Sequence, residues 1–340
     1  AQARAVMGLF VAGVDGGNTK TEALVASGDG ALLGYGRSGC GNYEGPGLEA
    51  ARSEIRKALE SAIAQAGVDA GDIAACCFGL AGADFPEDFV MLQKAMEELG
   101  LARKVIIEND AIIGLRAGTT LGYGAGVIMG GGTKTVGRAP DGREVRFPGE
   151  GYIFGDWGGG GQVSMDVLHR IFRAYQGRGK PTALLPAALE FLGVPDMEEL
   201  TRRLYRDEIS HEQRMALTPL CFRVAAQGDE VAQEIIKMVG EETAVSAAAV
   251  LKQLDLLDRP ADVVLIGSLF TKGEGPLLMD TVRARLAELA PHARPVRLRH
   301  PPVLGAILLA LEDCGVAVDE RIMARLEETA PKIIRGASEG

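Results

Sequence analysis

The order of apolar and polar positions predicts a strand-rich start to the chain. Residues 8–14 are apolar and strand-like, and turns at 15–18 and 28–30 separate them from two further strands, at 19–26 and 31–36. Three short strands joined by tight turns are typical of an antiparallel meander. The amino-terminal region should therefore begin with three neighbouring strands of one sheet.

Helices and buried strands alternate after this meander. Residues 48–66 place Ile55, Leu59 and Ile63 on one helical face. Residues 73–80 form a continuous apolar run, as expected for a parallel strand buried on both faces. The remaining predicted elements are a helix at 85–99, a strand at 104–108 and a helix at 110–117. The resulting order, β-β-β-α-β-α-β-α, indicates an α/β unit.

The same order restarts in the second half of the chain. Its predicted elements are strands at 124–129, 133–138 and 144–147, a mainly helical region at 161–250, a strand at 263–266, a helix within 273–289, a strand at 295–298 and a helix at 302–312. The turns also read alike, as GGNTKT at residues 16–21 and GGTKT at 131–135. This echo suggests two copies of one unit. Chance is the alternative, because glycine turns are common.

Length and composition narrow the functional classes. A chain of 340 residues exceeds what one core usually organises, so two domains are expected. The formal charge of −10 disfavours nucleic acid as a partner. Five cysteines without C-x-x-C spacing argue against a disulfide framework or a zinc site and favour the reducing cytoplasm. No apolar run reaches the ~18 residues that a membrane span needs.

The first candidate for chemistry is the turn after the first strand. Glycine lets backbone N–H groups approach a nucleotide phosphate closely, and a carboxylate such as Asp15 at the strand end can hold hydrated Mg²⁺ against the phosphates. The residues expected to face the phosphates are Gly16, Gly17, Asn18, Thr19 and Lys20. An ordinary tight hairpin is the alternative interpretation.

The second candidate is Asp110, at a predicted strand end that opens a helix. Ligand sites of parallel α/β sheets lie at the carboxyl ends of strands. An aspartate there can accept the proton of a substrate hydroxyl as the oxygen attacks phosphorus. The alternative is a helix N-cap, the commonest role of such aspartates. Asn109 can serve as the cap instead and leave Asp110 for chemistry.

Three glycine-rich segments follow in the second half. The turn at 130–133 looks like a second phosphate cradle, with a loose hairpin as the alternative. Residues 155–161 end in four consecutive glycines before a helix, which suggests anion binding at the helix N-terminus or a hinge. A buried strand ends at Gly267 and Ser268, where a flat purine can approach the backbone, although a plain strand exit is the simpler interpretation. Trp157 is either a stacking surface or a packing anchor.

Taken in order, these segments resemble the actin-like ATPase superfamily, and in particular the BadF/BadG/BcrA/BcrD-type ATPase family, over about residues 11–311. The resemblance implies an α/β protein with two RNase H-like domains, the actin-like ATPase fold, and a nucleotide and substrate cleft between them. The expected domains are residues 1–116, which the carboxyl-terminal helix at 320–340 can join, and residues 117–319.

The resemblance also implies an activity and site residues. The family includes N-acetylglucosamine kinase, so we expect an ATP-dependent kinase acting on a primary hydroxyl of an amino sugar such as N-acetylglucosamine, glucosamine or N-acetylmuramic acid. Its cofactors are ATP and Mg²⁺, and a cytoplasmic homodimer through residues 162–175 is expected. Asp110 takes the place of the catalytic base and Asp15 that of the Mg²⁺-organising carboxylate, through water. The remaining assignments are Gly131, Gly132 and Thr133 at the phosphates, Gly267 and Ser268 beside adenine, and Asn42, Gly82, Asp84, Glu150 and Asp156 at the sugar.

The chain departs from the family pattern in places. Family kinases usually read Gly-Thr-Gly-Ser in the second phosphate loop, whereas this chain has Gly131 in place of the threonine. Trp157 follows Asp156 where many relatives have glutamate, and Glu150 stands where some have a stacking aromatic. A non-catalytic sensor of ATP or sugar is therefore an alternative. An iron–sulfur ATPase activator of acyl-CoA dehydratases or reductases is disfavoured, because no cysteine lies between Cys77 and Cys221.

Overall fold

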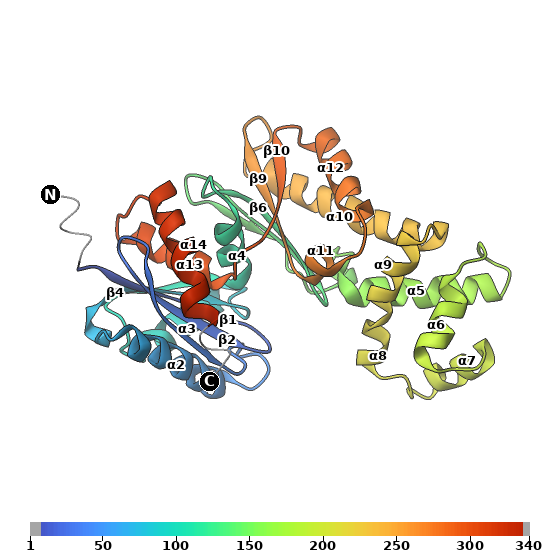
Figure 1. The fold of residues 1–340 in the computed structure, drawn as a ribbon, viewed down its shortest axis with the longest axis horizontal. Helices are drawn as coiled ribbons and strands as arrows, with labels where there is room; N and C mark the ends of the chain where they lie inside the picture. The colour runs from blue at the N-terminus through green and yellow to red at the C-terminus, as the bar shows by residue number, and fades with distance from the viewer. Residues whose placement is uncertain (1–7, 336–340) are drawn as a thin grey trace. The chain divides into compact units, whose positions relative to one another are not determined.

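A computed structural model describes residues 8–335, which form two compact units (Figure 1). The first comprises residues 8–122 and 298–335, and the second comprises residues 123–297. Each unit is an α/β structure built on one five-stranded mixed sheet.

The first unit contains the meander and two parallel strands. Its sheet has the order β3-β2-β1-β4-β5; β1, β2 and β3 are antiparallel, and β4 and β5 run parallel to β1. The central position of β1 brings its carboxyl end beside those of β4 and β5. The strands are β1 (Phe10–Gly16), β2 (Thr21–Ser27), β3 (Leu32–Ser38), β4 (Ile73–Leu80) and β5 (Val105–Asn109), close to the predicted ranges.

Helices cover both faces of this sheet. Glycines on the strands permit close contact: a Cβ on Gly34 would lie 2.0 Å from the carbonyl oxygen of Ala62 in α2, and one on Gly13 would lie 2.9 Å from the Cβ of Ala306 in α13. Neighbouring Ala12 and Val14 belong to the core under α2, so α13 lies on the opposite face. The helices are α2 (Leu48–Ala66), η1 (Ala70–Asp72), α3 (Pro86–Glu97), α4 (Asp110–Gly118), α13 (Val303–Asp313) and α14 (Glu320–Arg335).

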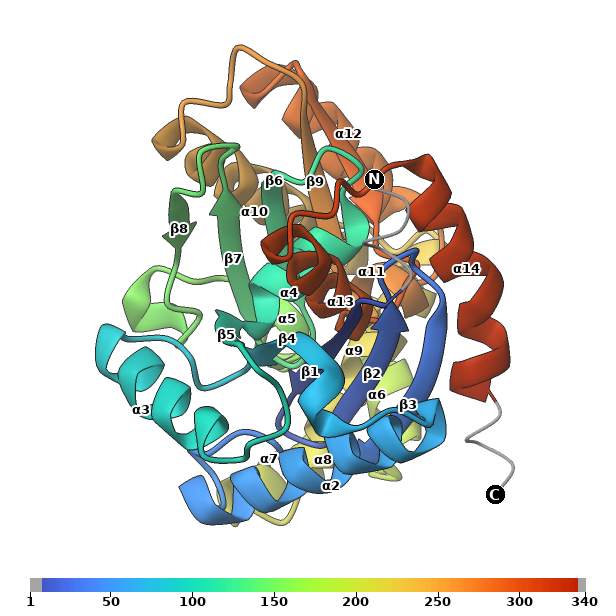
Figure 2. The ribbon, with the colours of Figure 1, turned by 90° about the vertical axis from the view of Figure 1, so that its left-hand side faces the viewer.

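Both carboxyl-terminal helices belong to the first unit. This agrees with the expectation for α14, whereas α13 lies before the expected boundary at residue 319 and was expected in the second domain. Every residue of α13 from Val303 to Leu311 is buried, against β1, β4 and α4. Gly305 allows this packing, since a Cβ there would lie only 1.8 Å from the carbonyl oxygen of Ile113. An ion pair of 2.7 Å joins Arg116 of α4 to Glu312 of α13. Helix α14 runs beside β3 (Figure 2).

The second unit repeats the strand order of the first. Its sheet reads β8-β7-β6-β9-β10, again an antiparallel meander followed by two parallel strands. The internal echo in the sequence is therefore confirmed at the level of topology. The strands are β6 (Gly124–Met129), β7 (Thr133–Arg138), β8 (Glu144–Arg146), β9 (Ala261–Ile266) and β10 (Ala293–Arg297).

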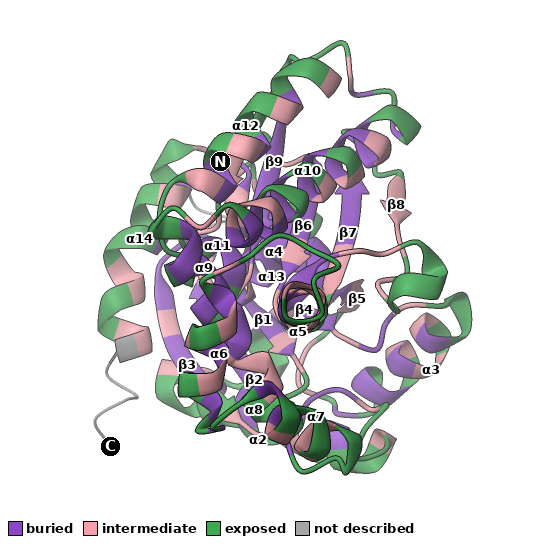
Figure 3. Ribbon diagram, turned by 90° about the vertical axis from the view of Figure 1, so that its right-hand side faces the viewer, coloured by how far each residue is buried: buried purple, intermediate pink, exposed green. Residues whose placement is uncertain are grey.

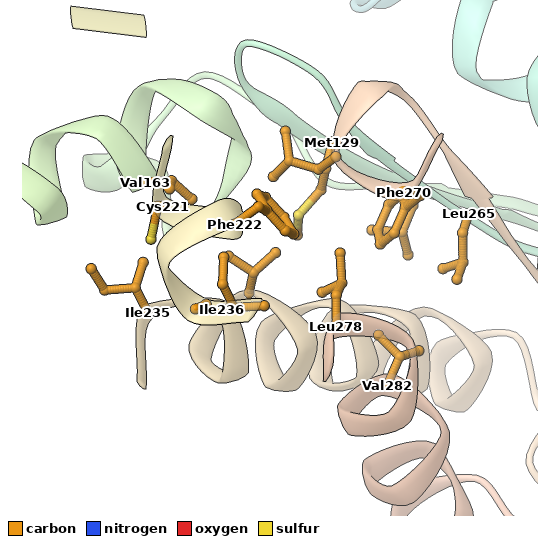
Figure 4. Packing of buried hydrophobic residues seen from close by; sticks show 14 of the residues in the cluster. Met129, Val163, Cys221, Phe222, Ile235, Ile236, Leu265, Phe270, Leu278 and Val282 are labelled. Atoms are coloured by element: carbon orange, nitrogen blue, oxygen red, sulfur yellow. The ribbon is translucent and has the colours of Figure 1, made fainter. Parts of the chain in front are cut away.

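A helical region packs on this second sheet. Its core contains Met129, Phe222, Ile236 and Leu278, from one strand and three helices (Figure 4). The central strands β6 and β9 are mostly buried, whereas the edge strand β8 is only partly buried and the outer helix faces are exposed (Figure 3). Across residues 8–335 we find no helix with the length and apolarity to cross a bilayer. The helices are η2 (Tyr152–Phe154), α5 (Gly159–Tyr175), α6 (Leu184–Leu192), α7 (Met197–Tyr205), α8 (His211–Met215), α9 (Leu217–Ala226), α10 (Glu230–Gln253), α11 (Ser268–Lys272) and α12 (Leu277–Leu289).

Candidate functional site

The turn between β1 and β2 forms a tight hairpin at the carboxyl end of the central strand. The Gly17 amide donates to the Lys20 carbonyl over 3.0 Å, and the side chains of Asn18 and Thr19 are exposed at the tip. Gly16 is required by packing, since a Cβ there would lie 2.7 Å from Leu80. The hairpin therefore presents its backbone and polar side chains at the sheet edge where ligands of such sheets bind.

Acidic side chains gather beneath this hairpin. Burial, with the negative charges of Asp110 and Glu22, raises the pKa of Asp15 to about 7, although Lys20 opposes the shift. Glu22 pairs with Asp15 across the ladder, so both side chains lie on one face. It is 6% exposed and accepts hydrogen bonds from Lys20 (2.5 Å) and from the Tyr35 hydroxyl (2.8 Å). A site with excess negative charge favours a cation.

Glu22 is a residue that sequence reasoning missed. The tight hairpin fixes the register of β1 and β2, and this register alone places a glutamate opposite Asp15. A register argument could therefore have found it.

The sequence leaves open whether Asn109 or Asp110 caps the helix that begins here, and the structure decides between them. The Asn109 side chain is fully buried and caps α4 by accepting from the Ala111 amide over 3.0 Å. Its amide group donates to the Ala83 carbonyl and to Asp84 Oδ1, both over 3.0 Å. Asp110 is the first helical residue, and its charge acts on Asp15. The helix cap is thus Asn109 and not Asp110.

The loops predicted to bind sugar meet in the same unit. Asn42 is buried, and Gly82 lies so close that a Cβ there would be 2.7 Å from both Asn42 Oδ1 and Tyr43 Cε1. A further carboxylate, Asp88 of α3, accepts from the Tyr43 hydroxyl (2.6 Å) and from the amide of Asp84 (3.2 Å). The structure therefore brings Asn42, Gly82 and Asp84 together. Asp88 was not foreseen, because its contact with Tyr43 joins segments that are distant in the sequence.

The second hairpin, between β6 and β7, is held by backbone contacts. The Gly130 amide donates to the Gly132 carbonyl over 3.0 Å. The amides of Gly160 and Gly161, in the first turn of α5, donate to the carbonyls of Gly130 (2.7 Å) and Gly131 (2.8 Å). Both amides already donate to backbone carbonyls, so in this structure they are not available to bind an anion. The prediction of an anion site at this helix N-terminus is therefore wrong for these two amides.

Close packing explains the glycine run before α5. Gly159 has a φ of +75°, and a Cβ there would lie 2.5 Å from the carbonyl group of Gly132. Only glycine accommodates both the left-handed backbone and this approach. The glycines at the start of α5 therefore allow this helix to pack directly against the hairpin between β6 and β7.

A pocket of about 360 Å³ opens beside the second hairpin. Its size falls within the range of small-ligand pockets. Gly267 bends the chain into the pocket wall with a φ of +108°, and a Cβ there would lie 2.4 Å from the Met129 carbonyl oxygen. Figure 4 shows Phe222 and Met129 near one another in the packed core of this unit. The lining residues are Gly130, Gly131, Gly160, Met215, Thr218, Pro219, Phe222, Ser268, Leu269, Lys272 and Gly273.

This pocket has apolar walls with polar groups at its rim, a chemistry that suits a flat heteroaromatic ring. The sequence predicted Ser268 beside such a ring and Gly131 at the phosphates. It missed Met215, Phe222 and Lys272, which come from helices whose position no local pattern reveals.

Glu150 and Asp156 lie on the segment between β8 and α5 of the second unit. Glu150 is exposed, and Asp156 Oδ2 accepts from the Gly151 amide over 3.1 Å. Trp157 is partly buried against the core of its unit, which favours the packing anchor over the stacking surface. Within residues 8–335, no three His, Cys, Asp or Glu side chains converge as a metal site.

Two mixed sheets of one strand order, each with a glycine hairpin beside its central strand, define an α/β protein of the sugar-kinase type of fold. The chain belongs to the BadF/BadG/BcrA/BcrD ATPase family, whose model matches residues 12–310. This confirms the resemblance drawn from the motifs.

Named relatives cover nearly the whole chain. An N-acetylmuramic acid/N-acetylglucosamine kinase of Clostridium acetobutylicum is 27% identical, over 90% of this chain and 99% of the relative. An N-acetyl-D-glucosamine kinase of Dictyostelium discoideum is 30% identical, over 88% and 97%. A crystal structure from Chromobacterium violaceum, provisionally assigned as an N-acetylglucosamine kinase, aligns with a TM-score of 0.63 at 23% identity, over 89% and 99%.

Proposed function

We propose that the protein is an ATP-dependent carbohydrate kinase that transfers the γ-phosphoryl group to a primary hydroxyl of an amino sugar. N-acetylglucosamine, N-acetylmuramic acid and glucosamine are the candidate acceptors, and the names of the two relatives support the first two. The observation that carries the proposal is the pair of carboxylates, Asp15 and Asp110, at the carboxyl edge of the first sheet, with Asn109 relieving Asp110 of the capping role.

Asp110 acts as the general base in this proposal. It orients the sugar hydroxyl toward the γ-phosphorus and accepts its proton as the oxygen attacks. The charge of Asp110 is one of the causes that raise the pKa of Asp15, so the two carboxylates lie within electrostatic range of each other.

Asp15 is suited to hold Mg²⁺ through water. A buried carboxylate with a raised pKa and acidic neighbours gains from a nearby cation, and Mg²⁺ commonly binds through one or two carboxylates plus phosphates. Bound there, the ion neutralises charge on the transferred phosphoryl group. Asp15 also organises the hairpin residues that face the phosphates: Gly16, Gly17, Asn18, Thr19 and Lys20.

The nucleotide base occupies the pocket of the second unit. Ser268, which directly follows Gly267, lines this pocket, while Gly131, Gly132 and Thr133 lead toward the phosphates. The apolar walls supplied by Met215, Phe222 and Leu269 supplement the residues foreseen from sequence.

The sugar is bound by Asn42, Gly82, Asp84, Glu150 and Asp156 in this proposal. The first three already lie together in the first unit. The last two are contributed by the second unit. We infer that the two units are the RNase H-like domains of an actin-like ATPase, with nucleotide and sugar in the cleft between them. Closure around both substrates excludes water and limits wasteful hydrolysis.

The proposal extends to the setting in which the enzyme acts. We expect a homodimer through α5, whose Met165 and Tyr175 are 64% and 52% exposed. Light scattering of wild type and of Met165→Glu tests this: a monomeric wild type would contradict it. ATP supply and the absence of disulfides among the described cysteines favour the cytoplasm.

One alternative loses support from the structure. An iron–sulfur activator needs cysteines in its second domain, where Cys221 is the only one in the described chain. That thiol is buried in α9, and burial raises its pKa to about 12. A thiol so protected from ionisation is a poor cluster ligand.

A coupled ADP-release assay tests the proposal directly. Wild type and Asp110→Asn are compared with Mg-ATP and a panel of amino sugars and plain hexoses. We expect turnover with at least one amino sugar and its loss in the variant. Tight ATP binding without any sugar-dependent turnover would instead favour a sensor of ATP or sugar.

A further inference from the structure

The loop at residues 39–44 is fastened to the first phosphate hairpin. The Gly41 amide donates to the Gly17 carbonyl over 3.0 Å, and the Thr21 hydroxyl donates to the Gly39 carbonyl over 2.8 Å. The approach is so close that a Cβ on Gly41 would lie 2.8 Å from the Cα of Gly16. A loop that carries an expected sugar residue, Asn42, is therefore built onto a hairpin expected to face phosphate.

Chemistry fixes the orientation of the Asn42 side chain. Its Oδ1 accepts from the Glu44 amide over 3.1 Å, and a backbone N–H can only donate. Its Nδ2 donates to the Glu44 carboxylate over 3.0 Å, and a carboxylate can only accept. Both contacts require the same orientation, with the NH₂ group toward Asn18.

The orientation of Asn18 follows from that of Asn42. Asn42 Nδ2 donates to Asn18 Oδ1 over 2.7 Å, so Asn18 must present its oxygen to the sugar loop. Its own NH₂ group is left on the other side of the amide plane. Asn18 is exposed at the hairpin tip, and among residues 8–335 this NH₂ group has no hydrogen-bond partner. Two donors are thus held ready at the phosphate-facing turn.

We propose that Asn18 couples the binding of the acceptor sugar to the binding of the nucleotide phosphates. Its oxygen holds Asn42 in the orientation that meets the sugar, and its NH₂ group donates to a phosphate oxygen. Each ligand therefore fixes the amide in the orientation that the other requires. The inference rests on the proposed kinase function and deepens it.

The other partner of Asn42 explains how a sugar can enter. Glu44 is exposed, so a sugar hydroxyl can replace its carboxylate at little cost while the bond to Asn18 is kept. Glu44 is thus a matched control: it contacts the same NH₂ group but has no link to the phosphate hairpin.

Calorimetric titration tests the proposal. The dissociation constant of a non-hydrolysable Mg-ATP analogue is measured with and without saturating N-acetylglucosamine, and that of the sugar with and without the analogue. Wild type should bind each ligand at least about fivefold more tightly in the presence of the other, the lower end of the usual coupling range. Asn18→Ala should reduce this factor to near one, whereas Glu44→Ala should keep it.

Asn18→Asp separates the two halves of the amide. The variant keeps an oxygen for Asn42 but loses both donors and adds a negative charge. It should bind the sugar alone as wild type does, and bind the nucleotide analogue about tenfold more weakly or worse, a loss of about 1.4 kcal/mol. Asn18→Ala should weaken both.

Each possible result decides the matter. Coupling that survives in Asn18→Ala, or sugar binding by Asn18→Asp that is as weak as that of Asn18→Ala, overturns the inference. Sugar-dependent turnover by a wild type that shows no coupling also overturns it, while the kinase function stands. A wild type that neither binds nor phosphorylates any sugar overturns both.

Discussion

The two glycine hairpins occupy the same place in two sheets of the same strand order, yet they differ in what surrounds them. The first lies over the acidic side chains of Asp15 and Glu22, with Lys20 as the counter-charge. The second, at residues 130–132, is held by carbonyl groups that accept from the amides of α5. Among the described residues its only neighbour within 4 Å of an added Cβ is Met215. The first hairpin is therefore surrounded by charged side chains, whereas the second presents mainly backbone groups beside an apolar pocket.

This difference teaches how a duplicated unit can divide one reaction. Moving a proton and holding a metal ion need carboxylates with tuned pKa values. Binding a base and the phosphates attached to it needs an apolar slot and open backbone. In the proposed function, the repeat supplies one scaffold, and the side chains at equivalent positions give each unit a different task.

The largest effect should follow from removing the base. Asp110→Asn keeps the size and the helix start but cannot accept a proton. Turnover should fall about 10²–10⁴-fold, or about 3–5 kcal/mol in barrier, as measured by ADP release at saturating substrates. Asp313→Asn, a carboxylate that pairs with Lys104 at the surface, is the control. More than about a tenth of wild-type turnover in Asp110→Asn would refute the assignment.

A smaller effect should follow from filling the pocket of the second unit. Ser268→Trp places a large ring into a space of about 360 Å³ from an exposed position on its rim. Affinity for a Mg-ATP analogue should fall about tenfold or more, while sugar binding persists. Thr271→Trp lies on the same short helix but outside the pocket lining, so this variant should bind the Mg-ATP analogue as wild type does. If both variants bound the Mg-ATP analogue with equal affinity, the nucleotide base would not bind in this pocket.

The pKa of Asp15 makes a prediction about the stability of the ligand-free protein. Its value is about 7 when folded, against 3.8 for the free side chain, because burial and neighbouring carboxylates penalise the charge. Between these values the folded state holds a proton that the unfolded state has lost, so stability falls as pH rises from about 4 to about 7. Asp15→Asn should remove that loss.

Thermal unfolding at pH 5 and pH 8 measures this effect. Asp15→Asn should raise the melting temperature more at pH 8 than at pH 5, although it should impair phosphoryl transfer. Glu22→Gln should act in the same direction and less strongly, because it removes one of two acidic neighbours. A melting temperature that shifts equally at both pH values would show that Asp15 is not the group responsible.

Local patterns foretold much of this fold. Strands β4, β6 and β7 have the predicted bounds, because continuous apolar runs and glycine turns are local signals. The placement of α13 in the first unit was not foreseen, because α13 is apolar on all sides and periodicity cannot say which sheet such a helix joins.

The site shows the same limit. Asp15, Asn109 and Asp110 follow from strand ends and could be placed on the correct edge of a sheet. Met215 and Phe222 reach the candidate pocket only through tertiary packing, which one sequence does not reveal. The same holds for the contact between Asp88 and Tyr43. The chemical roles assigned to the site residues remain predictions.

The smallest expected effects set the two hairpins against each other through one matched change, glycine to alanine. At Gly41 the added Cβ would lie 2.5 Å from Thr21 Oγ1 and 2.8 Å from the Gly16 Cα, which cannot move independently of β1. Overpacking of this kind should cost about 1–3 kcal/mol. At Gly131 the nearest atom is the flexible end of Met215, at 3.9 Å, so stability should change by no more than about 0.5 kcal/mol.

Urea unfolding of both variants measures the contrast, and equal costs would show that the hairpins are equally confined. The open space at Gly131 also means that Gly131→Thr, which introduces the residue usual in family kinases, should fold normally. The hydroxyl it adds lies at the pocket rim, where it can donate to a phosphate. A gain in ATP affinity would then show that a threonine hydroxyl at this position adds a favourable contact with the nucleotide that the glycine lacks.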